Sequence, residues 1–383
     1  MTEDFSDIGH TFSQDVLARL AGWVGKYQEN CIDELIVRGF DHIKKVPSST
    51  AITYVSTHRS EVDYMLEAYA LRSRKQNDCA GKPVLAIAAG DNLFVGEKFG
   101  DTVLNIGKFW RNCGAFKILR DVPKEKATGV TKHQLNYITH RMAEGDHFLT
   151  FAGIGRSYNG EFKPFDSAAV HVFSGAAERA NKQHVFIPVD ISYERVPEAT
   201  QFSFFAEYKR NKAEGKHTLW EKAQYYIRDW PYILWQGVRG RSLGNVTISF
   251  GVPMQSEGRS RHQKDQFVRD LETAAKKLVP ITSTALVCAA LRDTYNHEGS
   301  CRKDDVSQRM IRMQSAIDNT HPTLHIEKAH PAAMIERSRR FIGDHIPLKD
   351  GRFIINNHDL LNYYANSIKH YTQPWQSQTA SQL

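Results

Sequence analysis

The sequence predicts an α/β fold: a largely parallel or mixed sheet flanked by helices, with an N-terminal helical hairpin and a helical C-terminal region. Between residues 51 and 251, short apolar runs typical of strands alternate with stretches of helical periodicity, which is the pattern of a layered α/β domain. Helical spacing dominates before this region and again after residue 260. We therefore expect an N-terminal helical segment (1–47), an α/β domain (48–258) and a helical C-terminal region (259–383) packed on it.

The N-terminal segment carries apolar residues at helical spacing in two groups. They are Val16, Leu17, Leu20, Trp23, Val24 and Tyr27, followed by Ile32, Leu35, Ile36 and Phe40. Pro47 closes the segment, because proline cannot continue a helix. This pattern predicts helix over 13–45, folded as a hairpin of about 13–46.

The central region predicts strands at 51–57, 84–89, 114–119, 147–152, 184–193, 202–208 and 245–251. Helices are expected at 60–74, in a stretch through Trp110, at 125–144, at 166–181 and between the last two strands. Farther on, "ITSTALVCAAL" (281–291) has the length of a core helix, and "HDLLNYYANSIKHYT" (358–372) is also helical. No apolar run approaches the ~18 residues that a transmembrane helix needs.

Composition narrows the class of partner. The 383 residues are 41% hydrophobic and 24% charged, as in a globular chain, and the net charge is +7. This excess fits an anionic ligand or an anionic membrane surface better than nucleic acid, because no RNP, zinc-finger or basic-zipper pattern is present. The five cysteines are dispersed, which favours a reducing compartment over disulfides or zinc. The acidic N-terminus has no apolar signal-peptide core.

The stretch "STHRSEVD" places His58 and Asp63 directly after a strand. If a helix begins at Ser60, Ser60 is its N-cap and Asp63 stands at N3, close to the form of a capping box. That interpretation leaves His58 unexplained. A carboxylate that folds back onto the imidazole would fix its tautomer and raise its basicity, so that the other nitrogen could deprotonate a hydroxyl. Both interpretations fit these residues.

Three further strand ends carry unusual residues, and ligands of α/β proteins gather at such ends. "GAFKILRD" (114–121) brings Lys117 and Arg120 after a glycine. "FAGIGRSYNG" (151–160) combines Gly155, Arg156 and Ser157, which could cradle an anion with backbone N–H groups, a hydroxyl and a guanidinium. "FIPVDISYERV" (186–196) has Pro188 inside a strand, which suggests an edge or a strand end. A solvated cation, an ordinary glycine turn and local geometry would explain each one separately.

In this order and spacing, the four segments resemble the conserved blocks of the glycerolipid acyltransferases. "HRSEVD" is similar to their His-x4-Asp motif, and "AAGDNL" (88–93) and "NVTISFGVPM" (245–254) resemble segments between and after the blocks. "LLNYYANSIKHY" (360–371) resembles the C-terminal helix of the glycerol-3-phosphate and dihydroxyacetone-phosphate acyltransferases, which shorter lysophosphatidate acyltransferases lack. The resemblance covers most of residues 50–372.

The resemblance implies transfer of a fatty acyl group from acyl-CoA or acyl-carrier protein to the 1-hydroxyl of glycerol 3-phosphate, a step of phospholipid biosynthesis. His58 would be the general base and Asp63 its orienting partner, with no covalent acyl-enzyme. The acceptor phosphate would be held by Lys117, Arg120, Gly155, Arg156 and Ser157. Pro188 would shape the acyl or CoA site. No metal or organic cofactor is implied, and neither is a nucleic acid.

The third block departs from the family pattern. The family usually reads Glu-Gly-x-Arg-Ser, and here Gly153 stands in place of the glutamate. Asp91 and Glu144 are candidates to supply the missing carboxylate. The alternatives are a different acceptor, such as dihydroxyacetone phosphate or a lysophospholipid, or an inactive membrane-associated scaffold on the same fold. The intact His58 and Asp63 argue against the scaffold.

The resemblance also implies a place at the cytoplasmic face of a membrane, with peripheral attachment, because acyl chains partition into bilayers. The docking candidates are Phe12, Leu17, Trp23 and Trp110. The alternative is that each of these apolar side chains packs in the core.

Overall fold

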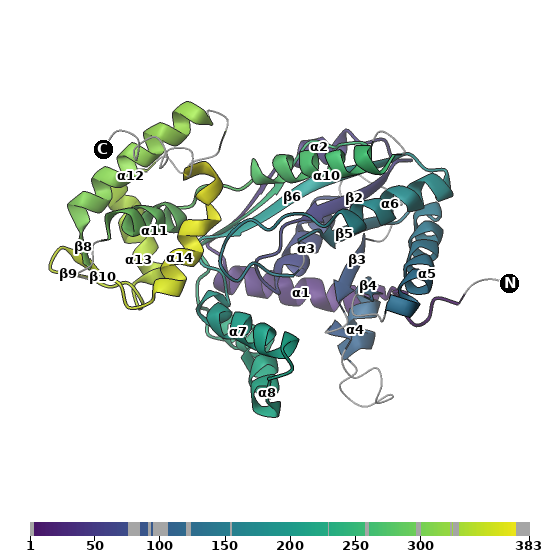
Figure 1. The fold of residues 1–383 in the computed structure, drawn as a ribbon, viewed down its shortest axis with the longest axis horizontal. Coiled ribbons are helices and arrows are strands. Elements are labelled where there is room, and N and C mark those ends of the chain that lie inside the picture. Colours follow the sequence, from purple (N-terminus) through teal and green to yellow (C-terminus); the bar gives the residue numbers. More distant parts are fainter. Residues whose placement is uncertain are drawn as a thin grey trace.

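The computed structural model describes residues 4–75, 85–90, 93–94, 106–119, 124–153, 155–228, 230–256, 260–295, 300–321, 324 and 329–372. Figure 1 shows a twisted sheet with helices on both faces, a helical region beside it at the C-terminal end, and a projection formed by the teal helices α7 and α8. None of the described helices combines the length and the apolar character needed to cross a membrane.

The sheet has seven strands in the described residues, in the order β1-β7-β6-β2-β5-β3-β4. They are β1 (Glu34–Arg38), β2 (Ala51–Ser56), β3 (Leu85–Gly90), β4 (Ala115–Ile118), β5 (His147–Phe151), β6 (His184–Tyr193) and β7 (Asn245–Phe250). Strands β6, β2, β5, β3 and β4 are mutually parallel, and β7 joins β6 in the antiparallel sense with β1 parallel to β7. The predicted mixed α/β sheet is confirmed. Its inner strands are continuous apolar runs because both faces are covered.

Two hydrophobic clusters fill the two faces of the sheet. Ile52 and Tyr54 of β2 belong to a cluster with α1 (Gln14–Cys31), α3 (Asp63–Lys75) and α4 (Ile106–Asn112). Their neighbours Ala51 and Val55 belong to the other cluster, with α5 (Lys124–Ala143), α6 (Ser167–Ala180) and α10 (Arg261–Lys276). Alternate residues of one strand thus serve opposite layers, as the pleat requires.

The predicted N-terminal hairpin is wrong in its second arm. Helix α1 is present, but "ELIVR" forms the edge strand β1, and only the short helix α2 (Phe40–Lys44) follows. The β-branched pair Ile36 and Val37 favours a strand, and pairing with β7 decides the outcome. Gly39 separates the two elements at φ 67°, where a Cβ would lie 1.9 Å from the carbonyl oxygen of Phe250.

The strand predicted at 202–208 is also wrong. A 3₁₀ turn, η3 (Ala199–Gln201), leads into helix α7 (Phe202–Ala213). Its aromatic residues suggest a strand, but Phe202, Phe205 and Tyr208 are buried at three-residue spacing, which is one face of a helix. Helices α8 (Leu219–Arg228) and α9 (Trp230–Val238) follow before β7.

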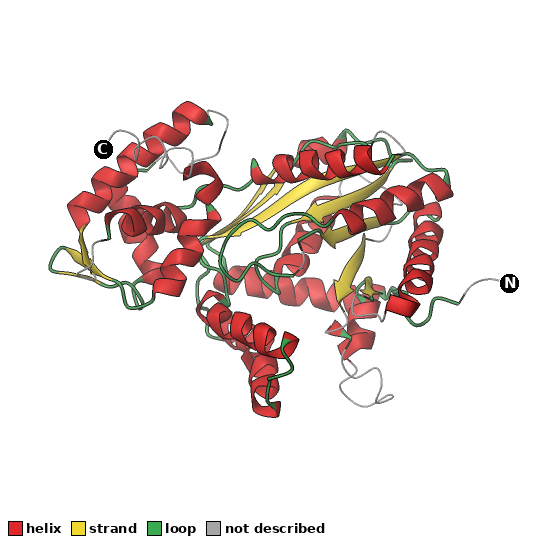
Figure 2. Cartoon of the chain, in the orientation of Figure 1, coloured by secondary structure: helices red, strands yellow, loops and turns green. Residues whose placement is uncertain are grey.

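The C-terminal region contains the predicted helices and a small antiparallel sheet that the sequence analysis missed (Figure 2). The helices are α11 (Ser283–Thr294), α12 (Lys303–Thr320), α13 (Pro331–Ile342) and α14 (His358–Ser367), and the strands are β8 (Ser300–Arg302), β9 (Leu348–Lys349) and β10 (Arg352–Ile354). Residues 283–291 of α11 are buried, as expected of a core helix. The first cluster runs from the sheet into these helices, so the region shares the core of the α/β layer.

Candidate active site

His58 and Asp63 are in contact at the carboxyl end of β2. His58 Nδ1 lies 2.9 Å from Asp63 Oδ2, and the aspartate side chain is fully buried, whereas the imidazole is 15% exposed. The ring of Phe151 packs against the imidazole with centroids 4.5 Å apart. With Nδ1 tied to the carboxylate, Nε2 is the nitrogen left for a substrate.

The same carboxylate fixes the turn that precedes α3. Asp63 Oδ2 accepts the backbone N–H groups of Arg59 at 2.6 Å and Ser60 at 2.9 Å, and Tyr193 donates its hydroxyl to Oδ1 at 2.5 Å. Helix α3 begins at Asp63, so Asp63 is its first residue and does not stand at N3, and the capping box predicted around Ser60 is wrong. One carboxylate therefore both fixes the turn before α3 and holds the His58 imidazole.

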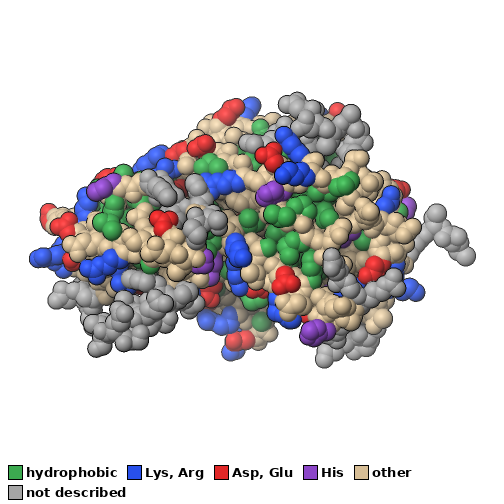
Figure 3. Space-filling model, turned by 90° about the horizontal axis from the view of Figure 1, so that it is seen from above, with side chains coloured by type: hydrophobic (Ala, Val, Ile, Leu, Met, Phe, Trp, Pro, Cys, Tyr) green, Lys and Arg blue, Asp and Glu red, His purple; other side chains and the backbone are tan. Residues whose placement is uncertain are grey.

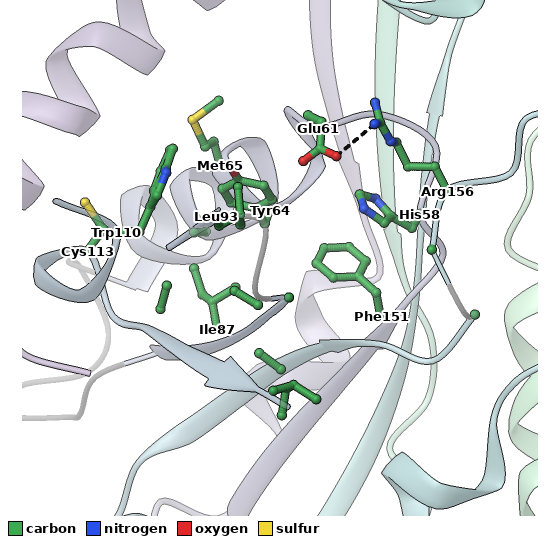
Figure 4. A pocket seen from close by; sticks show the side chains of 18 of the residues that line it. His58, Glu61, Tyr64, Met65, Ile87, Leu93, Trp110, Cys113, Phe151 and Arg156 are labelled. Atoms are coloured by element: carbon green, nitrogen blue, oxygen red, sulfur yellow. Dashed lines mark ion pairs between the residues drawn. The ribbon is translucent and has the colours of Figure 1, made fainter. Parts of the chain in front are cut away.

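A cavity of about 600 Å³ opens at His58. Figure 4 shows its two ends: His58, Glu61 and Arg156 lie together at one, and Trp110 and Cys113 lie at the other. Its apolar wall comes from α1, α3, α4 and the strands β3 and β4, through Leu20, Met65, Ala68, Ile87, Leu93, Trp110 and Ile118. Lys209 and Lys212 of α7 also line it. Such a mixed cavity suits an amphiphilic ligand.

Arg156 is held between two carboxylates. Its guanidinium lies 3.1 Å from Glu61 Oε1 and 2.9 Å from Glu198 Oε1, and its side chain is 2% exposed. Glu198 also accepts the Glu61 N–H and the Ser60 hydroxyl, at 2.9 and 2.6 Å. Burial raises the pKa of Glu198, and the Arg156 charge opposes this shift. Glu198 thus connects the segment that carries His58 (the first block) with the segment that carries Arg156 (the third block).

The fourth block supports the first through charged contacts. Asp190 of β6 accepts the Thr57 hydroxyl at 2.9 Å and the Arg59 guanidinium at 3.2 Å, and both charged side chains are buried. The sequence analysis missed Glu61, Asp190, Tyr193 and Glu198. The signal was present, because "PVDISYERVPE" places acidic residues in and just after a buried strand, where an unpaired charge would be costly.

The third block forms a glycine-containing loop beside His58. The Ser157 N–H donates to the His58 carbonyl at 3.1 Å, and the Ser157 hydroxyl donates to the Glu161 carbonyl at 2.7 Å. Gly155 has φ 70°, and a Cβ there would lie 3.4 Å from Lys209 Nζ. A Cβ on Gly153 would lie 3.2 Å from Lys163 Cβ, so the glycine gives Lys163 its room. A second, smaller cavity, lined by His58, Gly153, Gly155, Ser157 and Lys163 among others, lies at this loop.

The second block contributes less than expected to the cavity. Lys117 lies on β4 with its ammonium 5.1 Å from the centre of the Phe94 ring, and the cavity is lined by its neighbour Ile118. Arg120 lies outside the described residues, and so does Asp91. Glu144 pairs with Arg141 at the end of α5 and does not line either described cavity. The phosphate-binding roles of Lys117 and Arg120 stay predictions.

Pro188 lies inside the sheet, so the expected edge or strand end is wrong. It pairs with Val55 in the middle of β6, between β2 and β7. Its carbonyl accepts the Gly251 N–H, and the next bond toward that side runs from the Phe186 N–H to Met254. The ladder is interrupted between Gly251 and Met254, which is why a residue without an N–H is tolerated. Pro188 lines neither cavity, and its role at an acyl or CoA site stays a prediction.

Comparison with known proteins agrees with this geometry. Residues 37–192 match the family model "Acyltransferase", a span from β1 through β6. A curated glycerol-3-phosphate acyltransferase of Xylella fastidiosa (strain M12) is 22% identical over 368 residues, covering 88% of this chain and 39% of the relative. One of Pseudomonas aeruginosa (strain LESB58) is 25% identical over 269 residues, covering 70% of this chain and 29% of the relative.

Among solved structures, the 1-acyl-sn-glycerophosphate (LPA) acyltransferase PlsC of Thermotoga maritima is similar, with a TM-score of 0.38 and 14% identity over 68% of this chain and 78% of that one. The chain spans about two fifths of the length of the curated relatives from Xylella fastidiosa. The family model includes His58, Asp63, Arg156 and Asp190, which the fold brings together. Residues 37–192 of this chain are therefore similar to the acyltransferase domain that this family model describes.

Proposed function

We propose that the chain transfers a fatty acyl group from a thioester donor to a hydroxyl of a phosphorylated glycerol, with glycerol 3-phosphate as the leading acceptor. The observation that carries this proposal is the His58–Asp63 pair at the charged end of a cavity whose other end is apolar. The family model and the names of the curated relatives support the same chemistry.

His58 acts as the general base. Its Nε2 takes the proton of the acceptor hydroxyl while the oxygen attacks the thioester carbonyl. The C–S bond then breaks, and the thiolate leaves with the proton that the imidazolium returns. The products are an ester and a free thiol, and no acyl-enzyme forms. Asp63 keeps the proton on Nδ1 and stabilises the imidazolium.

The apolar end of the cavity holds the acyl chain. Met65, Ile87, Leu93 and Trp110 offer it a surface away from water, and Phe151 lies in the same cavity beside the imidazole (Figure 4). Burial of each methylene contributes about 0.8 kcal/mol, so chain length controls affinity strongly. A thioester placed at His58 leaves the CoA or carrier-protein part of the donor outside.

The charged end holds the acceptor. The Arg156 charge is already shared with Glu61 and Glu198, so Lys209 and Lys212, which line the same cavity, supply further positive charge for a phosphate. Glu61 provides the carboxylate that Gly153 lacks. It lines the cavity next to His58, where it can accept a hydrogen bond from a glycerol hydroxyl.

Because Glu61 and not a third-block residue supplies the carboxylate, transfer to a different acceptor is the second candidate function. The carboxylate comes from the first block instead of the third, so the hydroxyl it recognises stands in a different place from that in relatives with the third-block glutamate. Thiol release from palmitoyl-CoA, measured with glycerol 3-phosphate, dihydroxyacetone phosphate or lysophosphatidate, tests both candidates. Release stimulated by glycerol 3-phosphate supports the leading one. Stimulation only by another acceptor supports the second, and stimulation by none contradicts the transferase.

A further inference from the structure

Helix α9 carries an apolar stripe that no element among the described residues covers. Pro231, Leu234, Trp235 and Val238 are exposed at positions i, i+3, i+4 and i+7, which form one face of a helix. Leu234 is 43% exposed, Trp235 45% and Val238 87%. We call these four residues the α9 stripe. Apolar side chains at helical spacing normally face a core, so this stripe points to a partner.

The other face of α9 anchors the helix firmly. Ile233 and Gln236 are fully buried, and the ring of Tyr27 on α1 lies so close that a Cβ on Gly237 would be 2.8 Å from it. Gln236 donates to the Pro197 carbonyl at 2.8 Å, next to Glu198 of the active site. The stripe is therefore held on a fixed element, and this element touches the loop that positions Arg156.

The charged residues just after α9 in sequence are basic. Residues 230–244 contain no aspartate or glutamate. Arg239 follows the helix with its guanidinium 4.3 Å from the centre of the Trp235 ring, and Arg228 precedes it, 4.3 Å from the Phe204 ring. Arg241 pairs with Asp344 at 3.6 Å. On the face seen in Figure 3, by contrast, acidic and basic side chains are interspersed.

We propose that the α9 stripe docks this chain on the surface of an anionic phospholipid bilayer. Tryptophan and arginine on one helix face suit the interface, where the ring enters the headgroup layer and the guanidinium meets phosphates. A second copy of the chain fits less well, because a two-fold contact would bring Arg239 toward its own equivalent, and residues 230–244 contain no acidic residue to offset this repulsion. An acidic membrane supplies both the apolar layer and the opposite charge.

This surface differs from the docking candidates from the sequence. Trp110 is 7% exposed and lines the cavity, while Leu17 and Trp23 pack against the first cluster. Phe12 is 38% exposed, and its role in docking stays a prediction. If the proposed function holds, docking through α9 also places a cavity near lipid, because Tyr225 of α8 lines it and α8 packs on α9.

Co-sedimentation of the full chain with vesicles tests the docking. We expect binding to vesicles of equal parts phosphatidylglycerol and phosphatidylcholine, weaker binding to phosphatidylcholine alone, and loss of binding as salt is raised. The double variant Trp235→Ser/Val238→Ser should lower the partition coefficient by at least about tenfold. Arg239→Gln should weaken binding only to the anionic vesicles.

The matched control is Val252→Ser/Ile311→Ser, which removes two apolar side chains that are 63% and 50% exposed outside α9 and should bind as the unaltered chain does. Light scattering of each variant reports its mass. The proposal is overturned if the unaltered chain does not bind anionic vesicles, if the α9 variant binds like the control, or if the α9 variant changes from dimer to monomer. No acyl substrate is present, so the result is independent of the proposed reaction.

Discussion

The Asp63 carboxylate accepts four hydrogen bonds, from His58, from the backbone N–H groups of Arg59 and Ser60, and from the Tyr193 hydroxyl. The bonds from Arg59, Ser60 and Tyr193 fix Asp63 against the backbone turn and strand β6. The contact with His58 orients the base. Folding of the turn before α3 therefore orients the imidazole before any substrate binds. Such preorganisation makes a general base effective, because no reorganisation is needed during the reaction.

Glu61 provides the first test at this scale. Glu61→Gln removes the charge that faces the cavity, while Arg156 keeps its second partner Glu198. We expect kcat/KM for glycerol 3-phosphate to fall about 10- to 100-fold, because a charged hydrogen bond to the acceptor is weakened. Thiol release without acceptor should stay unchanged. Steady-state kinetics with varied acceptor measure both.

The control for Glu61 is Glu144→Gln, since Glu144 is an exposed carboxylate that pairs with Arg141 away from the cavity. Its kinetics should match those of the unaltered chain. Wild-type kinetics in Glu61→Gln would mean that the carboxylate missing at Gly153 comes from another residue, or that the acceptor does not need one.

At the scale of elements, helix α14 and the residues just after it are held against the third-block segment (151–160) and Glu161 by several contacts. Asn366 donates to the Asn159 carbonyl at 2.9 Å, Lys369 pairs with Glu161 at 2.6 Å, and Gly160 meets the backbone of Tyr363. The C-terminal helix that the resemblance singled out thus contacts the loop beside His58. It stabilises the active site although it lies about 200 residues away in sequence.

Gly160→Ala tests this contact. A Cβ at Gly160 would lie 1.8 Å from the Tyr363 carbonyl oxygen, so α14 would have to move. We expect the free energy of unfolding to fall by about 3 to 5 kcal/mol in urea titrations. Gly145→Ala is the matched control: its φ is 98°, but a Cβ there has nothing within 4 Å. Only the backbone strain of about 1 to 2 kcal/mol should appear. An equal loss of unfolding free energy in the two variants would contradict a close contact between Gly160 and α14.

Elements whose signal is local were predictable from sequence. The apolar runs of β2, β5 and β6 are typical of inner strands of a covered sheet, and "HRSEVD" indicates its site through a motif. The strand at Glu34–Arg38 was missed because pairing with β7, more than 200 residues later, decides it. Glu198 was missed for the same reason, since its partners Ser60 and Arg156 come from two other blocks.

At the scale of the whole molecule, buried histidines make the folding stability depend on pH. Burial lowers the pKa of His184 on β6 to about 4, below its ordinary value of 6.5. Burial likewise lowers the pKa of His10 to about 3 and that of His370 to about 4. The unfolded chain takes up these protons below pH 6.5, whereas the folded chain does not until about pH 4. Stability is therefore full above pH 6.5 and falls as the pH drops through this window.

The variant His184→Gln isolates the contribution of His184 to the pH dependence of stability. Glutamine can keep the contact with Thr53, which lies 2.8 Å from His184 Nε2, but it does not titrate. Between pH 7 and pH 5 the unaltered chain should lose about 2 kcal/mol more stability than the variant. Urea unfolding at the two pH values measures the difference. An identical loss in both proteins would mean that His184 is already protonated in the folded chain at pH 5.

The most direct test of the whole account is acyl transfer by the purified chain and by His58→Ala, followed as thiol release from palmitoyl-CoA with and without glycerol 3-phosphate. The account predicts release that depends on the acceptor in the unaltered chain and a loss of at least about a thousandfold in the variant, because the base that activates the hydroxyl is gone. Unchanged acceptor-dependent release in His58→Ala would contradict the mechanism.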